Sequence, residues 1–171
     1  MSSSSPNYRH VFEAEFPADP RTVFEVRTRF EEFIRPHGLN GEDLEAVKVA
    51  VSEAYTNAVC HGSPNGVGNR VRVRFEVSGD RCLSVEVWDQ GLGFQPVVGL
   101  PDSQEWKPSG RGLFLIAALM DQVHFEPAEH GTRVRMTKQL PPAEGEPDEP
   151  FRGGLEAAEL QPENCRLQIA K

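Results

Sequence analysis

Positions 53–62 read Glu53-Ala-Tyr-Thr-Asn57-Ala-Val-Cys-His61-Gly62 and close a segment that has the apolar spacing of a buried amphipathic helix. The apolar residues at that spacing are Leu44, Val47, Val51, Ala54 and Ala58. Glu53 and Asn57 are one turn apart, so a helix places them on one face. A carboxylate can accept a proton or orient a water, and a carboxamide oxygen suits magnesium. The pair indicates a site for a metal-bound phosphate, but a solvated Glu beside an Asn bonded to nearby backbone would have the same spacing.

The composition excludes several other classes of protein. The chain has 171 residues and a net charge of -8, which fits one domain with a substantial core and disfavours nucleic acid as the main partner. We expect no membrane span and no secretion signal, because apolar runs are short and the N-terminus is Ser-rich. The three cysteines are odd in number and the five histidines are scattered, which predicts reduced thiols in the cytoplasm and no zinc site.

The remaining sequence divides into strands and helices by its periodicity. Alternating apolar and polar residues predict strands over 8–16, 71–76, 83–88, 123–125 and 132–139. Helical spacing predicts helices over 20–35, 41–61 and 112–120, with Asp19 and Asn40 as the N-caps of the first two. We expect Val11 to point inward from the first strand. Residues 90–109 hold many Gly, Pro and Ser and form a long loop of the kind that is commonly functional.

This order of elements predicts an α+β fold. Consecutive strands pair as hairpins, which gives a two-layer sandwich of a mixed, mostly antiparallel sheet with helices on one face. The pattern is not an alternating βαβ unit, and no P-loop or dinucleotide-binding loop occurs. We expect a disordered N-terminus over 1–8, one domain over 9–140 and a Pro-rich tail over 141–171. The tail holds seven acidic and three basic side chains and is either disordered or a short docking segment.

Two glycine-rich segments follow the helix that carries Glu53. Asp89-Gln-Gly91-Leu-Gly93 comes directly after a strand, where an Asp can accept a hydrogen bond from an amine and glycines admit a ligand close to the backbone. Gly110-Arg111-Gly112-Leu113 opens an apolar helix, and the free N–H groups at a helix N-terminus bind phosphate oxygens. Taken singly, each segment is equally compatible with a turn or with a flexible loop that closes onto the core. Thr132 follows Gly131 at the start of a late strand, where Thr also favours strand structure.

Together and in this order, the motifs resemble those of the GHKL (Bergerat-fold) ATP-binding family. The anti-sigma-factor serine kinases within that family fit best. Their helix motif is similar to Glu53-Ala-x-x-Asn57-Ala-x-x-His61, and their second glycine box to Gly112-Leu-Phe-Leu-Ile-x-x-Leu-Met-Asp121-x-Val123. Histidine kinases need a two-helix phosphoacceptor unit, whereas only one helix is expected before the nucleotide helix here. Topoisomerase and Hsp90-type members need much longer chains. The resemblance covers about residues 9–140.

The resemblance implies a role for each motif residue. Asn57 would hold Mg²⁺, and Glu53 would be the general base for a serine hydroxyl or would orient it. Asp89 would accept a hydrogen bond from the adenine amino group of ATP, with Thr132 assisting through a water. The other implied nucleotide contacts, which shape the adenine pocket, close the lid or meet the phosphates, are Gly91, Gly93, Lys107, Gly110, Arg111, Gly112 and Leu113.

The resemblance also implies an activity and partners. The chain would be a protein serine kinase and anti-sigma factor that binds a sigma factor and phosphorylates a serine on a STAS-type (sulfate-transporter/anti-sigma-antagonist) protein. It would be a cytoplasmic homodimer through its first helix and a sheet edge. Exposed Phe24, Phe30 or Phe33 would fit that dimer, although their helical stripe favours the core. The alternative is a non-catalytic, ATP-gated sequestering module that does not depend on Glu53. A sensor-kinase relative would need an acceptor His from another chain.

Overall fold

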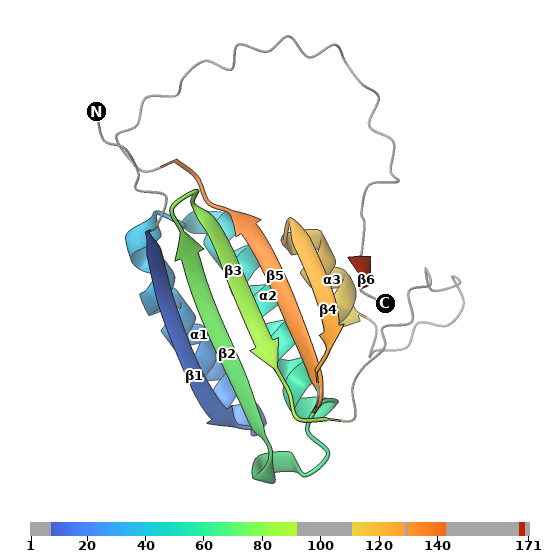
Figure 1. Ribbon diagram of the computed structural model, residues 1–171. Coiled ribbons are helices and arrows are strands. Elements are labelled where there is room, and N and C mark those ends of the chain that lie inside the picture. The colour runs from blue at the N-terminus through green and yellow to red at the C-terminus, as the bar shows by residue number, and fades with distance from the viewer. Residues whose placement is uncertain (1–7, 92–110, 129, 143–167, 170–171) are drawn as a thin grey trace.

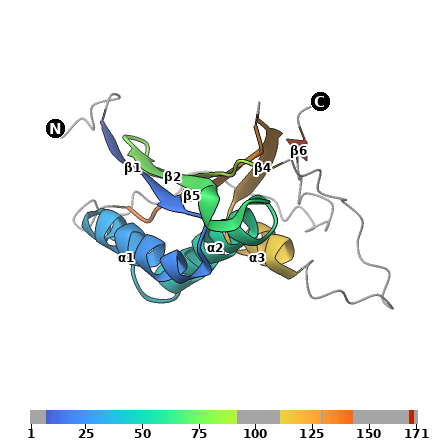
Figure 2. The ribbon, with the colours of Figure 1, turned by 90° about the horizontal axis from the view of Figure 1, so that it is seen from below.

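A computed structural model of the chain describes residues 8–91, 111–128, 130–142 and 168–169. The strands are β1 (Arg9–Pro17), β2 (Arg70–Ser78), β3 (Cys82–Trp88), β4 (Gln122–Pro127), β5 (Thr132–Gln139) and β6 (Gln168–Ile169). The α-helices are α1 (Val23–Ile34), α2 (Gly41–Cys60) and α3 (Arg111–Leu119), with short 3₁₀ turns η1 (Pro20–Thr22), η2 (Arg35–His37) and η3 (Gly66–Gly68). All three α-helices lie behind the sheet in Figure 1 and below it in Figure 2. The predicted α+β class, with helices on one face of the sheet, is therefore confirmed.

The sheet is antiparallel over its five long strands. Their order is β1-β2-β3-β5-β4, and the two-residue β6 pairs in parallel with β4. Side chains in register on neighbouring strands point to the same side, so apolar residues form rows across the sheet beneath the helices. One row is Phe12, Phe75, Val85, Met136 and Val123, and the next is Ala14, Val73, Val87, Val134 and Phe125. These rows form the part of the hydrophobic core that the sheet contributes.

The central helix is α2, which lies between α1 and α3 (Figure 2). Its buried side chains are Val47, Ala50, Val51, Ala54, Tyr55, Ala58 and Val59. Burial of each Val-sized side chain contributes about 1.5–3 kcal/mol relative to exposure. Tyr55 also shares a hydrogen bond of 2.7 Å with Thr22 at the start of α1. The polar face that carries Glu53 and Asn57 therefore belongs to a helix that is fixed on its other sides.

The orientation of β1 differs from the sequence-based expectation. Val11 is 42% exposed, whereas Phe12 points inward and stacks on Phe75 with ring centroids 5.4 Å apart. Both alternating sets of side chains in this strand contain apolar residues, and a shift of one residue exchanges them. The pairing of β1 with β2 puts the set that contains Arg9 and Glu13 in solvent.

Two expectations at the first helices also need correction. Asn40 precedes α2, but its side chain makes no cap hydrogen bond and instead donates to the Gly38 carbonyl oxygen at 3.3 Å. Phe24 is 75% exposed, whereas Phe30 and Phe33 are buried. The buried face of α1 is formed by Val26, Phe30, Phe33 and Ile34, and Phe24 lies off that face. Asp19 does cap that entry, because its carboxylate accepts from the Arg21 N–H at 2.9 Å.

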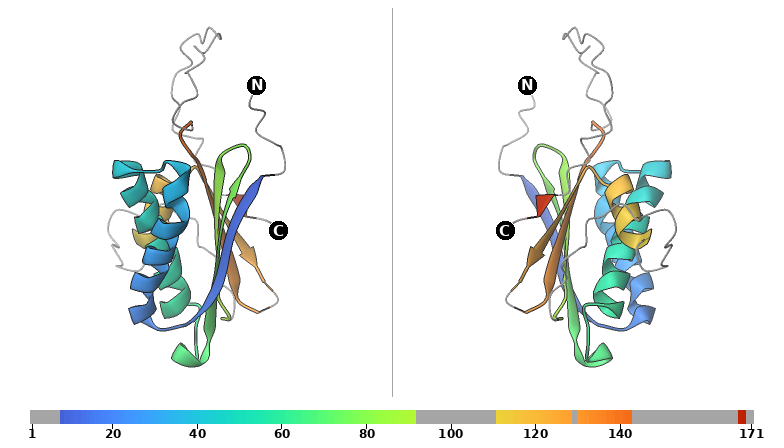
Figure 3. Two further views of the ribbon diagram at one scale, coloured as in Figure 1. Left: turned by 90° about the vertical axis from the view of Figure 1, so that its left-hand side faces the viewer. Right: turned by 90° about the vertical axis from the view of Figure 1, so that its right-hand side faces the viewer.

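Figure 3 shows that the helices cover one face of the sheet only. The register of the strands puts charged side chains, among them Arg74, Glu86 and Arg135, on the opposite face. Trp88 lies on this face between the guanidinium groups of Arg72 and Arg133, which are 5.2 and 5.3 Å from its ring centroid. Glu86 is buried beneath them and accepts hydrogen bonds of 2.7 Å from Arg133 and Arg135. The two Arg partners compensate the burial of the Glu86 carboxylate.

The two ends of the chain lie mostly outside the described residues. This holds for the predicted disordered N-terminus except Tyr8, and for most of the predicted tail over 141–171. Gln168–Ile169, within the tail, pairs with β4 next to His124 and Phe125. Of the helices that the structure describes, none has the length and apolar character needed to cross a bilayer.

Candidate functional site

The motif residues gather where four elements end or begin. The C-terminal end of α2, the end of β3 and the start of β5 meet at one end of the sheet, the lower end in Figure 1, and the start of α3 packs on α2 beside Glu53 and Asn57. The Asp89 N–H donates to the Thr132 carbonyl oxygen at 3.0 Å, which joins β3 to β5 at this point. Residues that are far apart in the sequence therefore form one site.

Asp89 is the buried carboxylate of this site. It is 8% exposed, and its Oδ1 accepts hydrogen bonds from the N–H groups of Gly91 at 2.9 Å and Thr132 at 3.0 Å. Among the described residues, no hydrogen bond is made to Oδ2. Two backbone donors therefore fix the carboxyl group through one oxygen, and the other oxygen remains an acceptor for a ligand.

The environment of Asp89 favours a bound hydrogen-bond donor. Burial raises the pKa of the Asp89 carboxyl above its ordinary value, while the N–H groups of Gly91 and Thr132 oppose that shift. A carboxylate that is poorly solvated gains more from a new donor than one in water does. Perturbed carboxyl groups of this kind are concentrated at functional sites.

Glycines surround Asp89 because the backbone of three segments touches it. A Cβ at Gly131 would lie within 2.6 Å of three Asp89 atoms, and Gly131 also has φ of +98°, where side chains are rarely found. A Cβ at Gly62 would lie within 2.5 Å of the Asp89 Cγ, Oδ2 and Cβ. Gly91 in turn packs on the Gly62 carbonyl group. The site around Asp89 is thus built from close backbone contacts that only glycine permits.

The Glu53–Asn57 pair lies against the start of α3. A Cβ at Gly112 would lie 2.7 Å from the Glu53 Oε2 and 3.4 and 3.5 Å from the Asn57 Nδ2 and Oδ1. Both side chains are half-buried on α2. The free N–H groups of the first turn of α3 are therefore next to a carboxylate and a carboxamide, an arrangement that suits a phosphate with its metal ion.

The donor set at this point fits magnesium when a phosphate is also bound. Across the described parts of the chain, no group of three or more His, Cys, Asp or Glu side chains could hold a metal ion. Magnesium commonly uses one or two protein oxygens together with substrate phosphates and water. The close approach of Gly112 brings the start of α3 to the Asn57 carboxamide, because a Cβ there would lie 3.5 Å from Oδ1.

The structure brings most of the predicted site residues into two groups. Glu53, Asn57 and Gly112 form one group, and Asp89, Gly91 and Thr132 form the other. Leu113 is partly buried and packs on the core, and Arg111 begins α3. Gly93, Lys107 and Gly110 lie outside the described residues, as does most of the predicted loop over 90–109.

The sequence-based prediction missed two residues at this site. Gly62 directly follows the motif on α2, and its contact with Asp89 joins the two groups. Gln90 Oε1 accepts from the Arg70 N–H at 2.7 Å and from the Asn69 Nδ2 at 3.4 Å, which ties the residue after Asp89 to the start of β2. The only signal for Gly62 in the sequence was its position at the end of a helix, where glycine is common for other reasons.

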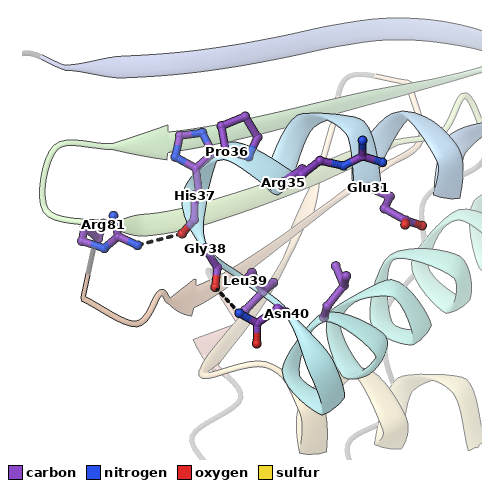
Figure 4. A pocket seen from close by; sticks show the side chains of 9 residues that line it. Glu31, Arg35, Pro36, His37, Gly38, Leu39, Asn40 and Arg81 are labelled. Atoms are coloured by element: carbon purple, nitrogen blue, oxygen red, sulfur yellow. Dashed lines mark hydrogen bonds between the residues drawn. The ribbon is translucent and has the colours of Figure 1, made fainter. Parts of the chain in front are cut away.

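A separate cavity of about 590 Å³ lies at the opposite end of β3, next to Arg81. Figure 4 shows its walls, which are Glu31, Arg35, Pro36, His37, Gly38, Leu39, Asn40, Leu44 and Arg81. Arg81 donates to the His37 carbonyl oxygen at 2.7 Å, and the His37 Nε2 is 2.8 Å from the Nδ1 of His10 on β1. None of the predicted nucleotide residues lines this cavity.

The site combines a buried carboxylate, which can accept a hydrogen bond from an amine, with a helix start whose N–H groups can bind a phosphate. A family model described as the histidine kinase-like ATPase domain matches residues 16–138. The chain belongs to this family. The GHKL resemblance is thereby confirmed, and the assignment makes this chain an ATP-binding domain.

Several curated relatives match most of the chain. It is 37% identical to the serine-protein kinase RsbW of Bacillus velezensis over 81% of this chain and 89% of the relative. It is 34% identical to the serine-protein kinase RsbW of Bacillus subtilis over 78% of this chain and 88% of the relative.

A solved structure has the same fold. The crystal structure of the RsbU and RsbW domains of a Mycobacterium tuberculosis protein matches with a TM-score of 0.60 at 24% identity. The match covers 78% of this chain and 34% of that longer chain.

Proposed function

We propose that this chain is an ATP-dependent protein serine kinase that acts as an anti-sigma factor. In this proposal it binds a sigma factor and phosphorylates a serine on a STAS-type antagonist protein. The similarity to relatives named serine-protein kinase RsbW supports the reaction type. The observation that carries the proposal is the contact of the start of α3 with both Glu53 and Asn57. That contact puts phosphate-binding N–H groups beside a carboxylate that can act as a base.

The adenine end of the proposed site is Asp89. Its Oδ2 would accept from the adenine amino group while Oδ1 keeps its two backbone donors. Thr132 is 2% exposed and lies beside the carboxyl group, where it would assist through a water. Gly91 and Gly131 would shape this end of the site by letting the backbone pack closely around the carboxyl group, because a Cβ at either position would overlap neighbouring atoms. Gly93 belongs to the same proposed pocket.

The phosphate end is the Glu53–Asn57 pair with the start of α3. Asn57 would hold Mg²⁺ through Oδ1, and the ion would neutralise developing charge on the transferred phosphoryl group. Glu53 would accept the proton of an incoming serine hydroxyl or orient that hydroxyl, since a base needs only hydrogen-bond reach of its proton. The remaining proposed phosphate and lid contacts are Lys107, Gly110, Arg111, Gly112 and Leu113. Phosphoryl transfer depends mainly on positioning and charge neutralisation, which this set of residues can supply.

The proposal extends to the organisation of the chain. We place the kinase domain at 9–140, which contains all the proposed site residues and the whole family match over 16–138. The pairing of Gln168–Ile169 with β4 supports a docking role for part of the tail over 141–171. A homodimer through α1 and the β1 edge, located in the cytoplasm, completes the proposal; exposed Phe24 on α1 is consistent with such a contact.

Phosphorylation of a purified STAS-type antagonist tests the reaction. The full chain is incubated with magnesium-ATP and antagonist, and phosphoserine is followed by mass spectrometry for wild type, Glu53→Gln and Glu45→Gln. Glu45 is the matched control, because it is an exposed Glu on the same helix that pairs with Lys48 at 2.8 Å. Loss of a general base lowers the transfer rate by about 10²- to 10⁴-fold, so Glu53→Gln should lose transfer while Glu45→Gln keeps the wild-type rate.

The other outcomes separate the alternatives. ATP binding without any phosphoserine in wild type would favour the non-catalytic sequestering module. Transfer by Glu53→Gln at the wild-type rate would remove Glu53 from the role of base. Absence of ATP binding by wild type would refute the proposed function itself.

A further inference from the structure

Gly62 lies between the two halves of the proposed nucleotide site. Its N–H donates to the carbonyl oxygens of Asn57 at 3.2 Å and Ala58 at 3.1 Å, so it closes the last turn of α2, which ends at Cys60. Its Cα side faces the Asp89 carboxyl group. The residue therefore touches the backbone of the proposed metal ligand and the side chain of the proposed adenine acceptor.

Position 62 requires glycine because of the atoms that surround it and not because of its backbone conformation. The φ of Gly62 lies outside the left-handed region, so its conformation is open to other residues. A Cβ there would lie within 2.5 Å of the Asp89 Cγ, Oδ2 and Cβ, whereas real Cβ contacts essentially never fall below 3.0 Å. Any side chain at position 62 must therefore displace Asp89 or the end of α2.

Gly91 also packs closely on Gly62. A Cβ at Gly91 would lie 2.8 Å from the Gly62 carbonyl oxygen and 3.0 Å from the Gly62 C and Cα. The Gly91 N–H also donates to the Asp89 Oδ1 at 2.9 Å. Gly62 is thus packed against both the Asp89 carboxyl group and Gly91.

We propose that Gly62 is a positioning residue that sets the place of the Asp89 carboxyl group relative to Asn57, and so determines the preference for adenine over guanine. This inference rests on the proposed function, because it assigns the adenine contact to Asp89. Adenine presents an amino donor at the position where guanine presents a carbonyl acceptor. A carboxylate held in place accepts from the first and repels the second.

The expected loss of ATP affinity follows from the overlap between a Cβ at position 62 and the Asp89 side chain. Restoring normal contact after the addition of a Cβ needs a shift of about 1 Å. A misplacement of about 1 Å can cost a hundredfold in a positioned site. We expect Gly62→Ala to lower the affinity for ATP by about 10- to 100-fold and to lower the affinity for GTP much less, so the ATP-to-GTP preference shrinks.

The test is a graded series of variants in the full chain. The dissociation constants of magnesium-ATP and magnesium-GTP are measured by titration calorimetry for wild type, Gly62→Ala, Gly91→Ala and Gly68→Ala, well below the unfolding temperature. Gly68 is the matched control, because it lies in the same loop, is exposed, and a Cβ there would meet only the Asn65 Cβ at 3.7 Å. We expect the loss of preference to be largest for Gly62→Ala, smaller for Gly91→Ala and absent for Gly68→Ala.

Each result decides between positioning and simple structural support. A structural role alone would lower the melting temperature and leave the ATP-to-GTP ratio of the folded protein unchanged, which would overturn the inference. If Gly62→Ala does not fold, the ratio for Gly91→Ala, which has the smaller overlap, decides in the same way. Failure of wild type to bind ATP would instead count against the proposed function.

Discussion

Replacement of Asp89 by Asn isolates one oxygen of the proposed adenine acceptor. Asn keeps an Oδ1 that can accept from the N–H groups of Gly91 at 2.9 Å and Thr132 at 3.0 Å. The change replaces Oδ2 with an NH₂ group, which donates where the proposed ligand also donates. We therefore expect Asp89→Asn to lose ATP affinity while the protein stays folded.

The magnitude follows from one charge-assisted hydrogen bond. Such a bond contributes roughly 1.5–3 kcal/mol, and 1.4 kcal/mol corresponds to a factor of ten. The dissociation constant for ATP should therefore rise by about 10- to 150-fold. The free energy of unfolding should change by less than about 1 kcal/mol, because both backbone donors keep an acceptor. Burial raises the pKa of Asp89, because burying the charged carboxylate costs free energy. Removing that charge in Asp89→Asn therefore offsets the free energy that is lost through weaker hydrogen bonds from the two N–H groups.

Calorimetric titration with magnesium-ATP and magnesium-GTP measures the affinities, and urea unfolding measures the stability. The matched control is Asp121→Asn, since Asp121 also accepts a backbone N–H, from Gln139 at 2.7 Å, but lies near the other end of the sheet. This control should bind ATP as wild type does. Unchanged ATP affinity in Asp89→Asn would refute the assignment of Oδ2 as the adenine acceptor, and lost affinity with global unfolding would refute the reasoning about Oδ1.

Two further predictions concern the metal ligand and the histidine pair. Magnesium should strengthen ATP binding to wild type but not to Asn57→Ala, and a magnesium-dependent gain in the variant, measured by titration calorimetry, would exclude Asn57 as the metal ligand. His37 is 7% exposed. Its pKa is lowered below the ordinary 6.5, mainly by burial and to a smaller extent by the electrostatic effects of His10 and Arg81. The folded state therefore binds fewer protons than the unfolded state, and the free energy of unfolding should fall as the pH drops below about 6.5. In His10→Gln, urea midpoints should depend less on pH in this range, because Gln keeps a polar partner for His37 without a charge; equal slopes in both proteins would contradict the coupling.

The local pattern of the sequence was sufficient for the order of the long helices and strands and for the local placement of most candidate site residues. The apolar spacing that ends at residues 53–62 predicted a buried helix, and α2 buries Val47, Val51, Ala54 and Ala58 as expected. Helical geometry alone then puts Glu53 and Asn57 on one face. Asp89 was predicted at a strand end, and it follows β3 directly. These features depend on neighbours within a few residues, so periodicity and turn chemistry determine them.

The errors arose where a local pattern allowed two solutions. The alternation in β1 is compatible with either face inward, and the pairing with β2 selected Phe12 over Val11. Asn40 stands at the N-terminal boundary of α2, but the geometry of the preceding turn directs its side chain to the Gly38 carbonyl oxygen. In both cases a long-range contact or the path of the chain decided between alternatives of similar local energy.

The sequence by itself predicted which residues would carry the chemistry of this protein, and only the tertiary structure decided how they are held together. Gly62 and Asp89 are far apart in the chain, and the contact between them exists because α2 and β3 end at the same edge of the core. The same is true of the His10–His37 pair, which joins β1 to the turn after α1. The spacing of residues in the sequence determines which face of a helix or strand a side chain lies on. The distance between the ends of two elements depends instead on the packing of the whole core.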